Sequence, residues 1–508
     1  MNLSHWIKHQ ANAQPKKCAI RCEGQDLSYA EVASKVDRLA DALVNELDVT
    51  RGDRVAYLGL NSPEFLLLLF ACARIGAILA PLNWRLAAPE HASMLKDAKP
   101  QCLFVEPEFV RHVEDISQDI GPMLQIAYGE NRSGWISYDK LLSGSSATDH
   151  AGDIGGPDDP VLLCYTSGTT GKPKGALLSN NALLCNAANS TDMHDLSSDD
   201  VILTILPMFH VGGLNIQTLP ALHAGATVVL LRRYETGLFF DAVENDGITL
   251  TLVVPTVAHA LVDDERWETA DFSSLRMIGV GSTIVSEGMV RAVGERGVPL
   301  VQVYGATETA PIAAYMPYRE TMQRPASTGK PAMHCEIRLV DEDCHDVAIG
   351  EKGEILVRGP NVMTEYWNDP EATAAAFSDG WLHTGDIAHY DDDGFLYVDG
   401  RIKDMIISGG ENVYPAIIEK VLSQCPDLTE VAVIGRPDDY WGEVVVAVIV
   451  PSGEMRDAER ILNFCEGRIA PFAMPREVIF VDRLPRNAMG KVVKEMLHET
   501  VLAVTAQT

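Results

Sequence analysis

The sequence is poor in positive charge. Its 508 residues include 41 Lys and Arg against 71 Asp and Glu, a formal net charge of −30. This balance argues against a nucleic-acid or anionic-membrane surface, because both require a basic face. Any anionic substrate must therefore meet basic groups that are concentrated locally.

Paired cysteines and long apolar runs are also lacking. None of the ten cysteines forms a CxxC pair or a zinc-like spacing, and several lie inside apolar runs. Such thiols behave as small core hydrophobes in a reducing compartment. The N-terminus has no apolar signal core, and Arg74 interrupts the most apolar stretch, residues 65–82. We expect a cytoplasmic protein without a signal peptide or membrane span.

Alternating apolar and helical patterns fill the first 300 residues. Ser28 and Glu31 form a capping-box pattern that predicts an amphipathic helix over 28–47. Strands are predicted at 54–60, 161–165, 201–205, 226–231, 249–254, 275–280 and 299–304, with helices at 63–78, 180–190, 237–246, 255–264 and 286–296. This alternation is typical of βαβ units and largely parallel sheets.

The pattern changes twice further along the chain. Shorter strands with Gly and Asp turns between 329 and 400 predict a β-rich subdomain. Helices at 415–424 and 457–468 and strands at 430–434, 444–450 and 477–481 then predict a compact piece. The fold class is α/β: a large N-terminal domain over 1–400 with parallel-rich sheets, helices and the β-rich subdomain, and a small mobile α+β domain over 401–508.

The stretch TSGTTGKPKG (166–175) has the composition of a phosphate-binding loop. It holds three Gly, four hydroxyls and two Lys directly after a strand, so the backbone can curl and present donors to an anion. A Walker A loop is excluded, because it would need Gly at Thr166 and Ser or Thr at Pro173. The alternative is an ordinary flexible turn.

Four other stretches carry chemical groups. YGATET (304–309) ends a strand with an aromatic ring, a hydroxyl and a carboxylate, and TGD (384–386) places a carboxylate in a predicted turn. GRIKD (400–404) leads into a Gly-rich loop, and PRNAMGK (485–491) sets a lone Lys after a Gly. Taken singly, these stretches could be a capping turn, an Asx turn, a linker and a solvated lysine.

Together, in this order and separation, the five stretches resemble the signature series of the adenylate-forming superfamily. The resemblance spans the chain from the helix at Ser28 to Lys491. LPMFHVGG (206–213), GPNVMTEYW (359–367) and KDMIISGGEN (403–412) look most like bacterial fatty-acyl, feruloyl- and benzoate-type CoA ligases.

The resemblance implies a role for each matching position. The phosphates of ATP would be held by Thr166, Ser167, Gly168, Thr169, Thr170, Gly171 and Lys174. Adenine would lie against Tyr304, with Gly281, Ser282 and Gly305 nearby; Thr307 would touch the α-phosphate and Glu308 would bind Mg²⁺. Asp386 and Arg401 would hold the ribose, His210 would line or gate the acyl pocket, Lys403 would be the hinge and Lys491 the adenylation lysine. Gly409, Gly410 and Trp441 would serve CoA.

The implied activity is a two-step ligation. The acid attacks the α-phosphorus of ATP to give an acyl-adenylate and pyrophosphate, and the CoA thiol then displaces AMP, with Mg²⁺ offsetting phosphate charge. Two alternatives stay open: an acyl-AMP ligase that loads a separate carrier protein, and a luciferase-like or silent nucleotide-binding homologue. The pocket candidates at 210–215, 279–282 and 305–312 contain no Lys or Arg, which predicts a monocarboxylate substrate. A homodimer also stays open.

Two departures from the resemblance concern the C-terminal piece. Ile417 stands where related enzymes usually have Glu, and Ala473 and Met474 stand where relatives often carry basic residues. The CoA phosphates would then need another cation, for which Arg468 and Arg476 are the candidates.

Overall fold

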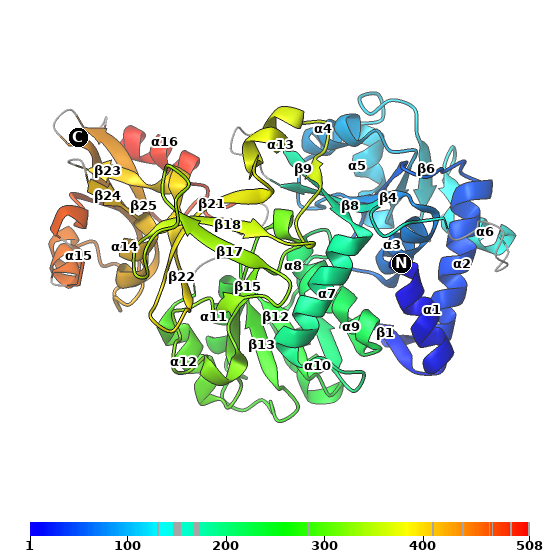
Figure 1. Ribbon diagram of the computed structural model, residues 1–508, viewed down its shortest axis with the longest axis horizontal. Coiled ribbons are helices and arrows are strands. Elements are labelled where there is room, and N and C mark those ends of the chain that lie inside the picture. The colour runs from blue at the N-terminus through cyan, green and yellow to red at the C-terminus, as the bar shows by residue number, and fades with distance from the viewer. Residues whose placement is uncertain are drawn as a thin grey trace.

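The computed structural model describes residues 1–129, 132–145, 154–166, 173–282, 285–408, 411–438, 441–466, 468–469, 471–487 and 490–505. The described chain forms four sheets with helices between and around them (Figure 1). The sheet of the last hundred residues lies at one end of the molecule, and the N-terminal helix lies toward the other end (Figure 1).

The first large sheet has the strand order β16-β15-β14-β13-β12-β10-β11-β1-β2. Its strands are β1 (Cys18–Cys22), β2 (Gln25–Ser28), β10 (Val201–Thr204), β11 (Thr227–Leu230), β12 (Leu250–Val253), β13 (Met277–Val280), β14 (Leu300–Tyr304), β15 (Ala314–Tyr315) and β16 (Lys330–Pro331). Pairing is parallel from β1 to β14 and antiparallel at both margins. The parallel-rich α/β class predicted from the alternating pattern is confirmed.

The second large sheet runs β19-β9-β8-β4-β3-β5-β6-β7. Its strands are β3 (Arg54–Leu58), β4 (Ile78–Pro81), β5 (Cys102–Val105), β6 (Leu124–Ala127), β7 (Ile136–Ser137), β8 (Pro160–Thr166), β9 (Lys174–Ser179) and β19 (Glu365–Tyr366). β8 and β9 pair antiparallel on either side of the predicted phosphate loop. β9 was missed in the sequence, because its short apolar run merges with the helix that Ser179 caps.

Two smaller sheets follow. One contains β17 (Glu336–Val340), β18 (Gly353–Arg358), β20 (Phe377–Ser378), β21 (Trp381–Tyr390) and β22 (Leu396–Arg401), the other β23 (Ile406–Ser408), β24 (Glu411–Val413), β25 (Leu428–Asp438), β26 (Gly442–Pro451) and β27 (Glu477–Phe480). The single turn η5 (Ile402–Asp404) joins β22 to β23. The chain thus passes from one sheet to the next at the residues predicted to form the hinge.

Helices cover the sheets. The α-helices are α1 (Ser4–Ala13), α2 (Tyr29–Asn45), α3 (Pro63–Ile75), α4 (Ala88–Ala98), α5 (Val110–Asp115), α6 (Tyr138–Gly144), α7 (Asn180–His194), α8 (Val211–Gly213), α9 (Leu219–Ala224), α10 (Thr236–Asn245), α11 (Pro255–Val262), α12 (Glu287–Glu295), α13 (Pro370–Ala376), α14 (Pro415–Leu422), α15 (Ala458–Cys465) and α16 (Lys494–Thr505). The Ser28–Glu31 capping box that starts α2 is present as predicted. Helix α3 ends earlier than predicted, because Gly76 adopts the left-handed C-cap conformation. Among the described helices, none combines the length and apolarity needed to cross a bilayer.

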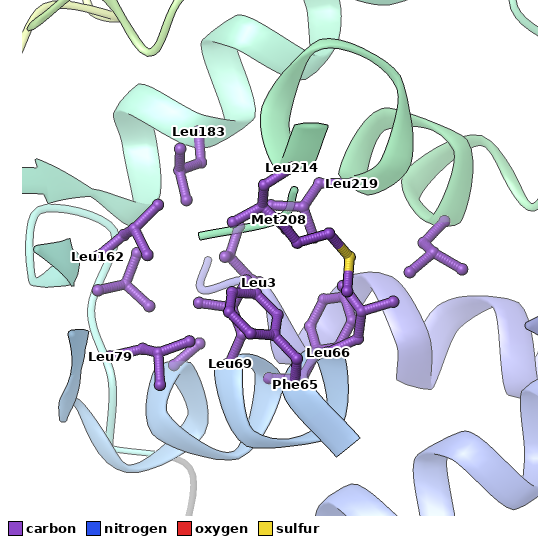
Figure 2. Packing of buried hydrophobic residues seen from close by; sticks show 14 of the residues in the cluster. Leu3, Phe65, Leu66, Leu69, Leu79, Leu162, Leu183, Met208, Leu214 and Leu219 are labelled. Atoms are coloured by element: carbon purple, nitrogen blue, oxygen red, sulfur yellow. The ribbon is translucent and has the colours of Figure 1, made fainter. Parts of the chain in front are cut away.

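The main core lies between the two large sheets. Phe65, Leu66 and Leu69 of α3 lie across from Leu183 of α7 and Leu214, and Figure 2 shows Leu3 and Met208 between the two groups. All of these side chains are at most 2% exposed, and burying such side chains stabilises a fold by roughly 1.5–3 kcal/mol each. This packing fixes α7 and the residues after His210 against the second sheet.

Candidate active site

Asp386 is the most heavily engaged of the predicted site residues. Tyr304 Oη donates to its Oδ2 at 2.9 Å, and Arg401 Nε donates to its Oδ1 at 2.9 Å. TGD (384–386) lies inside strand β21 rather than in a turn, which corrects the sequence-based placement. Gly385 takes a φ of 70° within an irregularity of the β18–β21 pairing, between His383 and Ile387, so the strand bends locally without ending. Register then places Asp386 opposite Arg401.

Burial sets the electrostatics of this carboxylate. Asp386 is 7% exposed, and desolvation raises its pKa while the Arg401 guanidinium and the Tyr304 hydroxyl oppose the rise. A buried carboxylate with partners on both oxygens is rigidly oriented. It can accept further hydrogen bonds from vicinal hydroxyls through its remaining lone pairs.

Glu308 is oriented by a residue to which the motifs gave no role. Tyr366 Oη donates to Glu308 Oε1 at 2.7 Å. The Lys174 ammonium lies 5.2 Å from the centroid of the same tyrosine ring. Tyr366 belongs to β19, which pairs with β9, so one short antiparallel contact brings the end of the phosphate loop to Glu308. In the sequence, only its place in the GPNVMTEYW motif distinguishes Tyr366 from other tyrosines.

Lys491 approaches the same place from the C-terminal sheet's side. Asp386 and Glu308 both favour its charged form, whereas Arg401 disfavours it. Desolvation dominates and lowers the pKa of Lys491 below its usual value. The Asn487 side chain accepts from the Lys491 backbone N–H at 3.0 Å and fixes the turn. An ammonium ion, two carboxylates and a guanidinium therefore converge from segments far apart in the sequence.

His210 directly precedes α8 and is its N-cap. Its Nδ1 accepts from Gly212 N–H at 3.2 Å, so the proton of the neutral ring sits on Nε2. Desolvation and the Lys491 charge lower the pKa of His210 to about 4. The ring is therefore neutral near pH 7, and it offers one N–H donor.

The chain before His210 is held by Asn61, which sequence reasoning missed. Asn61 Nδ2 donates to the Leu206 carbonyl at 3.0 Å, and its Oδ1 accepts from Met208 N–H at 2.8 Å. Gly213 is required on the other side of the turn, because a Cβ there would lie 2.4 Å from the Pro207 carbonyl oxygen. No local sequence pattern signals the Asn61 contact.

The remaining predicted nucleotide residues lie at the ends of β13 and β14. Gly281 follows β13, and a Cβ on it would lie 2.9 Å from Val303 Cγ1; Ser282 has a positive φ of 82°. Gly305 follows Tyr304, and a Cβ there would lie 1.5 Å from the Pro311 carbonyl oxygen, so only glycine fits. Thr307 is 8% exposed and opens the turn that carries Glu308. Ser167, Gly168, Thr169, Thr170, Gly171, Gly409 and Gly410 lie outside the described residues, whereas Thr166 ends β8.

Of the residues predicted for CoA, Trp441 contacts an arginine of the C-terminal sheet's domain. The Arg476 guanidinium carbon lies 3.9 Å from the Trp441 ring centroid, a cation–π arrangement. Ala473 and Met474 pack against the core of the C-terminal sheet instead. Ile417 is 36% exposed on α14, and Lys403 lies in η5 with an exposed side chain.

The donor set fits a magnesium ion shared with phosphates. In the described residues there is no group of three or more His, Cys, Asp or Glu that could hold a metal. Mg²⁺ in nucleotide sites typically takes one or two carboxylates, with phosphate oxygens and water completing its octahedron. The Glu308 carboxylate, which accepts from Tyr366 Oη, has the chemistry of such a single ligand and would hold the ion together with phosphate oxygens.

These features define an enzyme that activates an acid on a nucleotide phosphate. The sequence matches the AMP-binding enzyme family over residues 7–367 and the AMP-binding enzyme C-terminal domain over 417–491. The chain belongs to the AMP-binding enzyme family, as the motif resemblance predicted.

Three known proteins give the family context. Indoleacetate–CoA ligase of Aromatoleum aromaticum is 54% identical over 99% of both chains, and a feruloyl-CoA synthase of Amycolatopsis is 41% identical over 97% of both. The structure of O-succinylbenzoate coenzyme A synthetase from Bacillus subtilis with ATP and magnesium superposes with a TM-score of 0.85 at 31% identity, covering 97% of this chain and 98% of that one. These similarities confirm the predicted class, an AMP-forming acid:CoA ligase that uses ATP, Mg²⁺ and CoA.

We expect Glu308→Gln to weaken magnesium-dependent adenylation and leave the fold intact. The amide keeps the size of the side chain but loses the charge that a divalent cation requires. Acid-dependent pyrophosphate release measured against Mg²⁺ concentration should show a raised Mg²⁺ requirement. Tyr366→Phe is the matched comparison, because it removes only the hydroxyl on Oε1. An unchanged Mg²⁺ dependence in Glu308→Gln would refute the metal role.

Asp386→Ala should raise the KM for ATP about tenfold or more, since a charge-assisted hydrogen bond contributes about 1.5–3 kcal/mol. Steady-state adenylation at varied ATP measures the effect. Tyr304→Phe is the control, because it removes one partner of Asp386 and keeps the carboxylate. If the KM for ATP stays the same in Asp386→Ala, the carboxylate does not bind ATP and only stabilises strand β21.

Proposed function

We propose that the protein activates an aromatic monocarboxylic acid of the arylacetate type, such as indoleacetate, and transfers it to CoA. The convergence of Lys491, Asp386 and Glu308 supports the first step. The substrate class is suggested by the 54% identical relative, which is named an indoleacetate–CoA ligase. The second relative is named for ferulate, also an aromatic monocarboxylate.

In the first step, the acid's carboxylate oxygen attacks the α-phosphorus of ATP, and pyrophosphate leaves. Lys491 donates hydrogen bonds to the α-phosphate and the attacking oxygen, where negative charge builds up. Asp386 fixes the ribose, Tyr304 lies against adenine, and Thr307 touches the α-phosphate. Glu308 would hold Mg²⁺, which would offset negative charge on the phosphates.

In the second step, the CoA thiol sulfur attacks the acyl carbonyl carbon and AMP leaves with the bonding electrons. The thiol proton must be lost before or during the attack. Since Lys491 interacts with Asp386 and Glu308, we infer that the domain over 401–508 turns about Lys403 before the thiol attacks. Arg476 on the Trp441 ring would supply the cation for the CoA phosphates.

A luciferase-like oxygenase or a silent nucleotide-binding function has less support than ligation, because the similar proteins are named as CoA ligases and synthases. A carrier-loading ligase would form acyl-AMP and pyrophosphate and then acyl-carrier protein and AMP, without consuming CoA. The protein is further proposed to act in the cytoplasm, where its buried cysteines stay reduced. We also propose that the protein forms a homodimer. A measurement of its molar mass in solution tests this.

One assay separates these functions. Purified protein with ATP and Mg²⁺ should release pyrophosphate only when indoleacetate or a related acid is added, and CoA should then yield the thioester and AMP. Malonate and succinate should be poor substrates, because the pocket segments 210–215, 279–282 and 305–312 hold no Lys or Arg. Release of pyrophosphate without consumption of CoA would favour the carrier-loading alternative, and efficient malonate turnover would refute the monocarboxylate assignment.

A further inference from the structure

The motif GPNVMTEYW (359–367) lies against the turn that carries Glu308. It follows β18 and contains β19, the short strand that pairs with β9 beside the predicted phosphate loop. Asn361, Met363 and Tyr366 each form a hydrogen bond to that turn. Contacts that gather on one turn from one motif indicate that the motif holds the turn in place.

The backbone of the turn is held by the first two of these residues. Asn361 Nδ2 donates to the Thr309 carbonyl oxygen at 2.7 Å, and the Met363 N–H donates to the Glu308 carbonyl oxygen at 2.8 Å. Asn361 and Met363 are both buried, and hydrogen bonds away from water are electrostatically stronger than exposed ones. The backbone that carries the Glu308 side chain is therefore fixed relative to the motif.

The side chain of Glu308 is held by Tyr366. Tyr366 Oη donates to Glu308 Oε1 at 2.7 Å, and hydrogen bonds to a charged acceptor are among the strong ones. A carboxylate has about four acceptor sites. This bond therefore sets the orientation of the carboxylate and leaves acceptor sites for a cation.

Tyr366 is itself fixed by its surroundings. Its backbone pairs with Ala176 of β9, and its N–H donates to Thr373 Oγ1 at 3.0 Å. The ammonium of Lys174, which begins β9, lies 5.2 Å from the tyrosine ring centroid, within the range of a cation–π contact. One rigidly held side chain thus connects a lysine predicted to bind the phosphates with the carboxylate predicted to bind the metal.

Glu308 also has a competing partner. The Lys491 ammonium and the Glu308 carboxylate attract each other, and an ion pair between them would take up oxygens that the metal needs. Opposite charges that meet in a partly buried site are screened only weakly. A hydroxyl donor on Oε1 opposes this pairing, because the carboxylate would lose the hydrogen bond if it turned toward Lys491.

We propose that Tyr366 is a positioning residue for magnesium: it holds the Glu308 carboxylate on the side of Lys174, so that the ion and the ATP phosphates bind together. This inference rests on the metal role of Glu308 in the proposed function. It assigns to the Tyr366 hydroxyl a part in the binding of magnesium and none in the binding of ATP without the metal.

The test measures the binding of ATP to the full chain with no acid present. The Kd of ATP is determined by calorimetry in EDTA and again with Mg²⁺, and the first value divided by the second is the magnesium factor. Tyr366→Phe should lower the magnesium factor about tenfold, because a hydrogen bond to a charged group is lost. The Kd in EDTA should stay within about twofold of that of the unaltered protein, because the phenylalanine ring keeps the contact with Lys174.

A double variant tests whether Tyr366 acts through Glu308. Glu308→Gln should lower the magnesium factor at least as far as Tyr366→Phe, and the protein with both changes should match Glu308→Gln alone. Tyr165→Phe is the matched control. Tyr165 Oη donates to Asp97 Oδ2, also at 2.7 Å, from the other strand that flanks the predicted phosphate loop. Its magnesium factor should be that of the unaltered protein.

The inference is overturned by any of three results in Tyr366→Phe. These are an unchanged magnesium factor, an equal weakening of ATP binding with and without Mg²⁺, and a further fall in the factor when Glu308→Gln is added. An unchanged factor in Glu308→Gln would refute the metal role and this inference together. Because no acid enters the measurement, a failure of the arylacetate proposal is seen separately, as a lack of acid-dependent pyrophosphate release.

Discussion

Lys491→Ala is expected to reduce acyl-adenylate formation from ATP by about 10²–10³-fold, the usual effect of removing one preorganised donor from a developing negative charge. The same variant should still convert synthetic acyl-adenylate and CoA to the thioester at close to the normal rate. The reason lies in the placement of the ammonium, which interacts with Asp386 and Glu308 on the nucleotide side. Half-reactions measured separately by pyrophosphate release and thioester formation give the two rates.

Lys494→Ala is the matched control for this experiment. Lys494 belongs to the same segment, but its ammonium lies 3.0 Å from Glu419 Oε1 and 3.0 Å from the Val433 carbonyl oxygen, within the C-terminal sheet. It should leave adenylation unchanged. Equal loss of both half-reactions in folded Lys491→Ala would contradict a role confined to adenylation.

The pH dependence of adenylation follows from the same residue. Desolvation and Arg401 lower the pKa of Lys491 below 10.5, and the charged ammonium is the active form. Adenylation is therefore complete below the lowered pKa and falls as the pH rises through it. Lys491→Arg should shift this alkaline limb upward, since a guanidinium keeps its proton above about pH 12. If the alkaline limb of the pH profile does not move in Lys491→Arg, it reports the titration of a group other than residue 491.

Lys403→Pro is expected to act in the reverse sense, slowing thioester formation from acyl-adenylate by at least about tenfold, or about 1.4 kcal/mol, with adenylation largely kept. Lys403 lies at the centre of η5, between the sheet that carries Asp386 and the C-terminal sheet. Proline fixes φ near −65°, which a single 3₁₀ turn already uses. The present arrangement is thus tolerated, while a large change of backbone angle at this residue is blocked.

The variant Lys403→Ala distinguishes an effect of backbone freedom at residue 403 from an effect of its charge. The Lys403 ammonium disfavours the charged form of Lys491, so the alanine variant removes this repulsion and leaves φ free. Thioester formation should stay near normal in the alanine variant and fall in the proline variant. If both fall alike, the charge matters and the hinge does not; if neither falls, the proposed rotation does not pass through residue 403.

The sequence by itself determined the element pattern and most of the site's membership. Period and capping placed α2, α12 and the strands β10 to β14 within two residues of their observed ends, because hydrophobic periodicity is a local signal that survives into the fold. The five motifs also identified Tyr304, Glu308, Asp386, Arg401 and Lys491. Their functional roles remain predictions.

Only the tertiary structure decided how these residues are oriented. Asp386 lies in a strand opposite Arg401, Tyr366 holds Glu308 across 58 positions of sequence, and Asn61 holds the chain before His210. Each contact arises because sheet register and helix packing bring together segments that are distant in the chain, and neither composition nor periodicity encodes such partners. Side-chain hydrogen bonds at a site depend on this long-range geometry, whereas secondary structure depends mainly on neighbours along the chain.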